Sequence, residues 1–153
     1  MQQAKDDYTI NTDKEMLQLD YIHGFLSKTY WAENIPKEVV ERAINGSLCF
    51  GVYHHQKQIG FARVITDEAT FAYLCDVFID EAHRGKGLSK RLMETITTYP
   101  TLQGLRRFML ATKDAHGLYR QAGFEPLTFT DSWMQIHQPD VYKKTAPPEN
   151  NGI

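Results

Sequence analysis

The stretch from Asp76 to Lys90 constrains the fold more than any other part of the sequence. It begins with an apolar run typical of a β-strand, turns through Gly85 and Gly87, and continues as a helical pattern to about Tyr99. A strand, a glycine-rich turn and the start of a helix together direct backbone N–H groups toward a phosphate. The glycines lack the Cβ atoms that would block close approach. We therefore predict a pyrophosphate-binding loop at this turn, with added positive charge from Arg84, Lys86 and Lys90.

Two common phosphate-binding motifs do not fit this turn. A P-loop requires a glycine five residues before the Gly-Lys pair, and Asp80 stands there. The dinucleotide-binding fingerprint requires a third glycine where Lys90 stands. What remains is the pattern Arg-x-x-Gly-x-Ser over residues 84–89. The alternative is a glycine-rich loop that only connects a strand to a helix.

A second pattern lies between Asp114 and Pro126, where Leu118-Tyr119 is followed after three residues by Gly-Phe. Together, the two stretches resemble the GNAT N-acetyltransferase superfamily. Its acetyl-CoA signature is Arg/Gln-x-x-Gly-x-Gly/Ala, and its last helix carries the Leu-Tyr and Gly-Phe pattern. Ser89 departs from the signature, which has Gly or Ala at that place. The resemblance covers residues 73–126.

Periodicity and turn residues predict the order of elements along the chain. The expected strands are 8–12, 47–54, 58–66, 71–79, 106–112, 127–130 and 133–137. The expected helices run from a capping box at Thr12 and Glu15 to about Thr29, from Pro36 to Gly46, from the glycine turn to Tyr99, and from Asp114 to Gly123. We expect one domain over residues 1–138 and a disordered tail over residues 139–153.

The resemblance implies an α/β (α+β) architecture, the GNAT acyl-CoA N-acyltransferase fold. Its mixed, strongly twisted sheet is flanked by helices on both faces. It also implies that the strands at 71–79 and 106–112 splay apart and that acetyl-CoA lies between them.

Composition narrows the class of protein and its compartment. A formal net charge of −2 gives no general attraction to nucleic acid. No apolar run approaches the roughly 18 residues of a membrane span, and the N-terminus lacks the apolar core of a signal peptide. Cys49 and Cys75 lie in apolar runs, which predicts buried free thiols and favours the cytoplasm. The histidines show no zinc-ligand spacing, so we predict no metal and interpret His54-His55 as an exposed turn.

The resemblance also assigns roles in cofactor binding and catalysis. The backbone of Val77, Phe78 and Ile79 would pair with the pantetheine arm of acetyl-CoA, and one of their N–H groups would stabilise the thioester oxygen. The pyrophosphate would be held by Arg84, Gly85, Lys86, Gly87, Leu88, Ser89 and Lys90. Tyr119 matches the family tyrosine that faces the CoA sulfur and would protonate the leaving thiolate. The alternative is that Tyr119 only packs in the cleft.

The general base is open to several interpretations. Asp76 is the nearest carboxylate to the pantetheine-binding backbone, and His116 lies three residues before Tyr119 on the same helical face. Either residue is a candidate base, and either could instead be structural. A chain of water molecules leading to solvent is a third possibility. We expect Asp114 to cap the helix that follows it.

The acceptor site is expected at the break between the first two helices and along the central strands. Tyr30 and Trp31 fall in that break, and Tyr73 and Met134 are further candidates for the pocket wall. Arg63 lies on an apolar face of its strand, where it either binds an acceptor carboxylate or pairs internally with Asp76 or Asp67.

These features predict an acetyl-CoA-dependent N-acetyltransferase whose partner is a small-molecule amine, acting by direct attack in a ternary complex. The alternatives are acetylation of a protein lysine or N-terminus, and a non-catalytic acyl-CoA-binding module. Nucleic acid and membrane are not expected as partners. Pairing of exposed C-terminal strands would give a homodimer.

Overall fold

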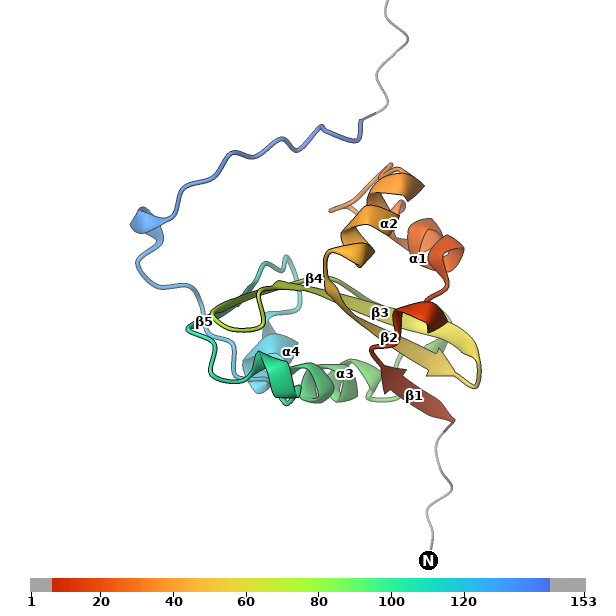
Figure 1. Cartoon of the computed structure of the whole chain (residues 1–153). Helices are drawn as coiled ribbons and strands as arrows, with labels where there is room; N and C mark the ends of the chain where they lie inside the picture. Colours follow the sequence, from red (N-terminus) through yellow and green to blue (C-terminus); the bar gives the residue numbers. More distant parts are fainter. Residues whose placement is uncertain (1–6, 144–153) are drawn as a thin grey trace, which may run out of the picture.

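The computed structural model describes residues 7–143, in which one mixed sheet separates two layers of helices (Figure 1). The sheet has five strands in the order β1-β2-β3-β4-β5. Neighbouring strands are antiparallel except β4 and β5, which are parallel. The strands are β1 Tyr8–Asn11, β2 Leu48–His54, β3 Lys57–Thr66, β4 Phe71–Ile79 and β5 Arg107–Leu110. The predicted mixed sheet with helices on both faces is confirmed.

The α-helices of the described residues lie on both faces of the sheet (Figure 1). On one face lie α1 Leu19–Leu26 and α2 Lys37–Asn45, and on the other lie α3 Leu88–Thr97 and α4 His116–Gln121. Each layer has its own buried cluster, because each helix turns an apolar stripe toward the sheet. Phe78 joins the α1 side by stacking on Phe25, with ring centroids 3.8 Å apart. No helix within residues 7–143 has the length and apolarity that crossing a membrane requires.

The N-terminal part of the chain departs from the predicted capping box. Asp13, not Thr12, caps a short 3-10 helix, Lys14–Met16, by accepting a hydrogen bond from the Glu15 N–H at 2.9 Å. An Asp side chain can bond the backbone two residues on, and this local turn competes with a regular helix. α1 therefore begins later than predicted, at Leu19. α2 stops at its C-cap Gly46, as predicted, whereas Pro36 is the N-cap and not a residue of the first turn.

Of the two predictions for the ends of α4, the one for its start is wrong and the one for its end is confirmed. Asp114 does not cap the helix, because Ala115 occupies the N-cap position. The Ala115 N–H instead donates to the Thr112 Oγ1 at 3.1 Å. The predicted end at Gly123 is confirmed, since this glycine follows the C-cap with a φ of +101°.

The two strands predicted at 127–130 and 133–137 are wrong. The only regular element after α4 in the described chain is a 3-10 helix, Thr130–Ser132, and the segment runs away from the sheet (Figure 1). A strand needs a partner edge, and this segment pairs with none in the described chain. Residues 139–143 form turns, and Tyr142 packs against the α1–α2 cluster. The rest of the predicted tail lies outside the described residues.

Candidate active site

A cleft opens where β4 and β5 stop pairing. The parallel register runs from Phe71 opposite Arg107 to Leu74 opposite Leu110, where β5 ends. β4 continues alone on this side to Ile79. A cavity of about 550 Å³ occupies the opening and is lined by Tyr30, Trp31, residues 73–77, residues 110–115 and Tyr119. The splay implied by the family resemblance is therefore present in this chain.

A bulge in β4 shapes one wall of this cleft. The register between β3 and β4 shifts between Phe61 and Arg63, and Asp76 takes a left-handed φ of +55°. A bulge bends its strand and re-aims the side chains around it. Beyond Leu74, the β5-facing edge of β4 pairs with no strand in the described chain. Such an edge can hydrogen-bond an extended ligand as an added strand.

The predicted pyrophosphate loop lies at the end of β4 and opens a second, smaller cavity of about 150 Å³. Gly87 occupies the N-cap of α3 with a φ of +74°, and no side chain of the described chain caps that helix. Gly85 has a φ of +81°. A Cβ atom on either glycine would meet no atom of the described protein within 4 Å. Backbone conformation, rather than crowding within the protein, thus calls for glycine, and the space in front of the helix stays open for an anion.

The other loop residues contribute in different ways. Leu88 is buried in the core and also lines the cavity. The Arg84 Nε donates to the Ile79 carbonyl at 3.0 Å, which fixes the turn against the strand end. Lys86 and Lys90 are exposed. Together with Ser89, which lines the cavity, these residues surround the α3 N-terminus with donors and positive charge.

Asp76 joins three parts of the structure at the cleft. One carboxylate oxygen accepts from the Trp31 Nε1 at 2.9 Å and the other accepts from the Arg63 Nε at 2.8 Å. Arg63 also donates to the Ser47 Oγ at 3.0 Å. The internal pairing of Arg63 is confirmed, with Asp76 as its partner. Because the Asp76 carboxylate already accepts two hydrogen bonds, it is better suited to holding Trp31 and Arg63 in place than to accepting a proton. Its role as the general base stays a prediction.

Tyr119 lies in the wall of the cleft and is almost completely buried. Burial raises the pKa of the Tyr119 phenol above its ordinary value near 10, and nearby Tyr30 and Asp114 act in the same direction. The phenol therefore carries its proton at neutral pH, as a proton donor must. Its role as the acid that protonates the leaving thiolate stays a prediction.

The remaining candidates do not all meet in this cleft. His116 is exposed and lines a separate cavity beside β5, although Tyr119 borders both cavities. Tyr30, Trp31 and Tyr73 do line the cleft, as predicted. Met134 is 95% exposed and does not line it.

Sequence reasoning missed two charged residues of the cleft, Lys113 and Asp114. The Lys113 Nζ lies over the Tyr30 ring, 5.2 Å from its centroid. Asp114 was assigned to helix capping, because an Asp just before a helix pattern is usually a cap. The family pattern starting at Leu118 gave no signal for either residue.

Cys75 is the thiol that lines the cleft. Burial raises its pKa to about 12, so the sulfur stays protonated and is a poor nucleophile at neutral pH. Cys49 and Cys75 are both free, as predicted, although Cys75 is only partly buried.

Similarity to known proteins agrees with this arrangement. The sequence profile of the acetyltransferase (GNAT) family matches residues 14–124. Protein FG08082 of Gibberella zeae, whose name assigns it provisionally to the acetyltransferases, is 33% identical over 139 residues, or 76% of this chain and 77% of that protein.

Two solved structures share the fold. A GNAT-family protein from Xanthomonas campestris pv. campestris is 51% identical with a TM-score of 0.88, over 90% of this chain and 97% of that chain. A GNAT-family acetyltransferase from Elizabethkingia anophelis, solved with acetyl-CoA bound, has a TM-score of 0.61 at 14% identity, over 88% and 90% of the two chains. The cleft between β4 and β5, the glycine loop before α3 and these matches lead to one conclusion: the chain belongs to the GNAT family of acetyltransferases.

Proposed function

We propose that this protein transfers the acetyl group of acetyl-CoA to a primary amine of a small molecule, by direct attack in a ternary complex. The observation that carries the proposal is the continuity of β4. Its residues 73–77 line the wide cleft, and Ile79, two residues on, lines the anion pocket at the start of α3. One strand thus connects a phosphate site to a reaction site. The acetyl-CoA bound to the similar fold of the Elizabethkingia anophelis protein supports this choice of donor.

The protein supplies binding and electrostatic stabilisation through its backbone. The glycine loop and the first N–H groups of α3 hold the pyrophosphate, with Arg84, Lys86 and Lys90 around it. The free edge of β4 at residues 77–79 pairs with the pantetheine arm. An N–H of this edge stabilises the negative charge that develops on the thioester oxygen, an effect often worth a few kcal/mol.

Tyr119 holds the proton for the leaving group. Its phenol lies in the cleft wall and stays protonated at neutral pH because burial raises its pKa. The proton passes to the sulfur, or is shared with it in a hydrogen bond, as the carbon–sulfur bond breaks and the carbon–nitrogen bond forms. Asp76, held by Arg63 and Trp31, keeps the cleft wall in place during this step.

We take a cationic amine as the acceptor because the exposed Asp114 carboxylate can pair with it, although Lys113 also gives the cleft one positive charge. Asp76 is already paired with Arg63, which leaves Asp114 as the carboxylate of the lining that is exposed to an incoming ammonium group. The aromatic rings of Tyr30, Trp31 and Tyr73 supply an apolar wall for the rest of the acceptor. Loss of the ammonium proton before attack requires a base, and Asp76, His116 and a water chain stay predictions for that role.

The test is acceptor-dependent release of CoA thiol by the full chain. A panel would contain amino acids, polyamines, aromatic amines and lysine peptides, with a reaction lacking acceptor as the blank. We expect turnover with a small cationic amine. Asp114→Asn should raise the KM for that amine about tenfold or more without changing the KM for acetyl-CoA, since a hydrogen bond to a charged group is worth about 1.5–3 kcal/mol.

The control and the contrary outcomes are equally specific. Asp131→Asn changes an exposed Asp outside the cleft and should leave both KM values unchanged. Turnover with peptides alone would assign the protein to the protein acetyltransferases. Binding of acetyl-CoA without turnover of any amine would support a binding module, and equal thiol release without acceptor would indicate hydrolysis.

A further inference from the structure

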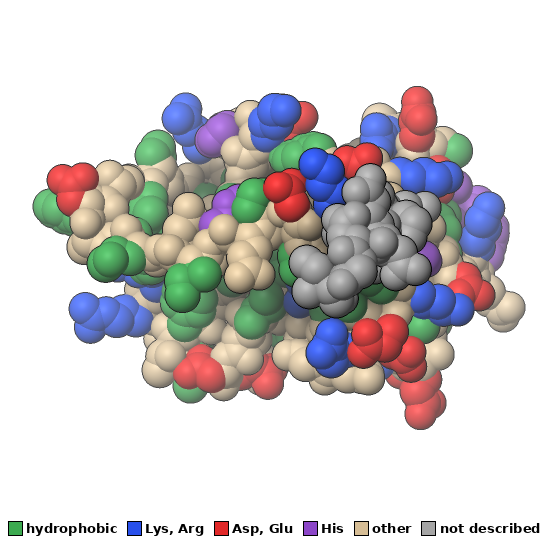
Figure 2. All heavy atoms as spheres, turned by 90° about the horizontal axis from the view of Figure 1, so that it is seen from above, with side chains coloured by type: hydrophobic (Ala, Val, Ile, Leu, Met, Phe, Trp, Pro, Cys, Tyr) green, Lys and Arg blue, Asp and Glu red, His purple; other side chains and the backbone are tan. Residues whose placement is uncertain are grey.

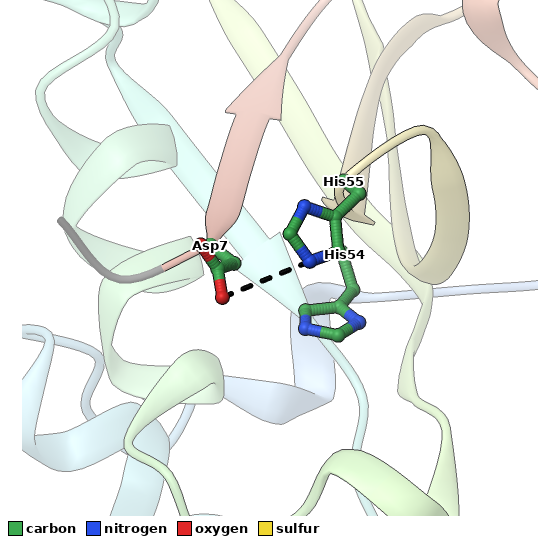
Figure 3. A group of neighbouring side chains, drawn as sticks. All are labelled: Asp7, His54 and His55. Carbon is green, nitrogen blue, oxygen red and sulfur yellow. Dashed lines mark ion pairs between the residues drawn. The ribbon is translucent and has the colours of Figure 1, made fainter.

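A second group of potential ligands lies away from the cleft, where β1 begins and β2 ends (Figure 3). Tyr8 stands opposite His54 in the β1–β2 register, and the His55 N–H donates to the Asp7 carbonyl at 3.0 Å. The sheet itself therefore fixes Asp7 beside the two histidines. The sequence could not show this, because Asp7 is far from His54 and His55 along the chain.

The backbone brings the two adjacent histidines to the same side. In a regular strand successive side chains point to opposite faces. His55 instead has a left-handed φ of +56°, and its ring centroid lies 4.5 Å from that of His54. One ligand atom from each of Asp7, His54 and His55 lies within 4.8 Å of the other two. The Asp7 carboxylate points toward the His55 ring, with Oδ2 3.7 Å from Nε2 (Figure 3).

Two neighbouring aromatic rings pack against His54. The His54 ring lies 4.8 Å from the Tyr8 ring and 5.1 Å from the His83 ring, centroid to centroid. The Tyr8 hydroxyl and the His83 Nδ1 are joined by a 2.7 Å hydrogen bond. His54 is thus held between packed aromatic groups while His55 and Asp7 stay accessible. These contacts fix the position of the His54 ring, one of the three proposed ligands.

We propose that Asp7, His54 and His55 bind one divalent transition metal ion of the zinc type. Two imidazoles and a carboxylate are ligands that Zn²⁺ accepts, whereas Mg²⁺ and Ca²⁺ prefer sites built from oxygen alone. Metal–ligand bonds of about 2.0–2.2 Å require the three ligand atoms to approach by about 1 Å. The exposed side chains of Asp7 and His55 can make this movement by rotation. Water completes the coordination.

The competing interpretation is a weak surface ion pair between Asp7 and His55, with His54 serving only in packing. Isothermal titration of the tag-free full chain with Zn²⁺, and separately with Mg²⁺, distinguishes the two. We expect one Zn²⁺ per chain and no Mg²⁺ binding. His55→Gln and Asp7→Asn should each weaken Zn²⁺ binding more than about tenfold, because each removes a ligand.

The controls separate this site from other zinc ligands of the chain. His137→Gln removes an exposed histidine outside the cluster and should leave Zn²⁺ affinity unchanged. Co²⁺ should give the absorption of nitrogen and oxygen ligation. An intense thiolate charge-transfer band would place the metal at Cys49 or Cys75 and overturn the proposal. So would equal Zn²⁺ affinity in His55→Gln, in Asp7→Asn and in the unmodified chain, or the absence of Zn²⁺ binding.

Discussion

Asp76 has a left-handed backbone conformation, which residues other than Gly, Asn, Asp and His rarely adopt. A left-handed residue of this kind costs of order 1–3 kcal/mol and persists where surrounding contacts over-determine it. Here the contacts are the hydrogen bonds from Trp31 and Arg63. The same residue lies at the bulge of β4, two residues beyond the last β4–β5 pair, Leu74 opposite Leu110. The left-handed residue and its two hydrogen bonds thus lie in the wall of the cleft.

Tyr119 gives the sharpest prediction at the scale of one residue. Tyr119→Phe removes the phenol proton and keeps the ring that packs in the cleft wall. We expect kcat to fall about 10²- to 10⁴-fold, with the KM for acetyl-CoA nearly unchanged. Because the pKa of Tyr119 is raised, its ionisation should not produce a loss of activity anywhere below about pH 10 in the unmodified protein.

Steady-state kinetics across pH with saturating acetyl-CoA provide the measurement. Tyr99→Phe is the matched control, since Tyr99 bonds the Thr12 Oγ1 at 3.2 Å and does not line the cleft. It should leave kcat unchanged. An unaltered kcat in Tyr119→Phe would mean that the Tyr119 hydroxyl takes no part in the reaction and that the residue only packs in the cleft wall.

The sequence predicted individual residues only where a local pattern carried information. Arg63 stands among apolar residues on one face of its strand, which left open an internal partner or an acceptor carboxylate, and the structure pairs it with Asp76. The bond from Trp31 to Asp76 depends on how the α1–α2 loop packs on the sheet, and no local pattern encodes it. Asp114 was misassigned because capping and cleft positions look alike in sequence.

At the scale of elements, the sequence predicted β2, β3 and β4 almost to the residue. Their apolar runs are bounded by polar turns, and each has a partner strand next to it in the chain. The same apolar pattern failed after α4, because an extended segment becomes a strand only when an edge pairs with it. The start of α1 was misplaced for a local reason, the Asp13 cap.

The start of α3 is the element whose function is most directly testable. In Gly87→Ala the new Cβ would project into the open space before the helix, and the φ of +74° would be strained. We expect the KM for acetyl-CoA to rise more than about tenfold, with kcat at saturation little changed. Kinetics with acetyl-CoA varied at fixed amine give both values.

Gly104→Ala is a matched control for this change. Gly104 has a φ of +72°, and its Cβ would also meet nothing within 4 Å, but it lies in the loop before β5 and lines none of the cavities of the site. Both variants should lose a similar amount of thermal stability, of the order of 1 kcal/mol. Only Gly87→Ala should raise the KM. An unchanged KM in Gly87→Ala would mean that this loop does not bind the phosphate of acetyl-CoA.

The whole molecule leaves apolar surface on the segment after α4. Hydrophobic side chains protrude at the left end of the face shown in Figure 2, where Figure 1 places this segment. Phe129 is 87% exposed, Met134 95% and Ile136 94%. β5 also has one edge that pairs with no strand of the described chain. A free strand edge can pair with another chain, and exposed apolar patches often mark interaction sites.

A second copy of the chain could cover both the apolar segment and the free β5 edge. In a twofold-symmetric dimer the segment of each chain would lie against the β5 edge of its partner. The homodimer expected from the sequence relied on pairing between two C-terminal strands that the described chain does not form, so an interface between this segment and β5 is a different prediction. Light scattering coupled to size exclusion should give twice the chain mass. Met134→Ser combined with Ile136→Ser should shift the mass toward that of one chain. Met16→Ser, which changes an exposed methionine on the 3-10 helix before α1, should not. A single-chain mass for the unmodified protein at every concentration would mean that the segment folds back on its own β5 or stays uncovered.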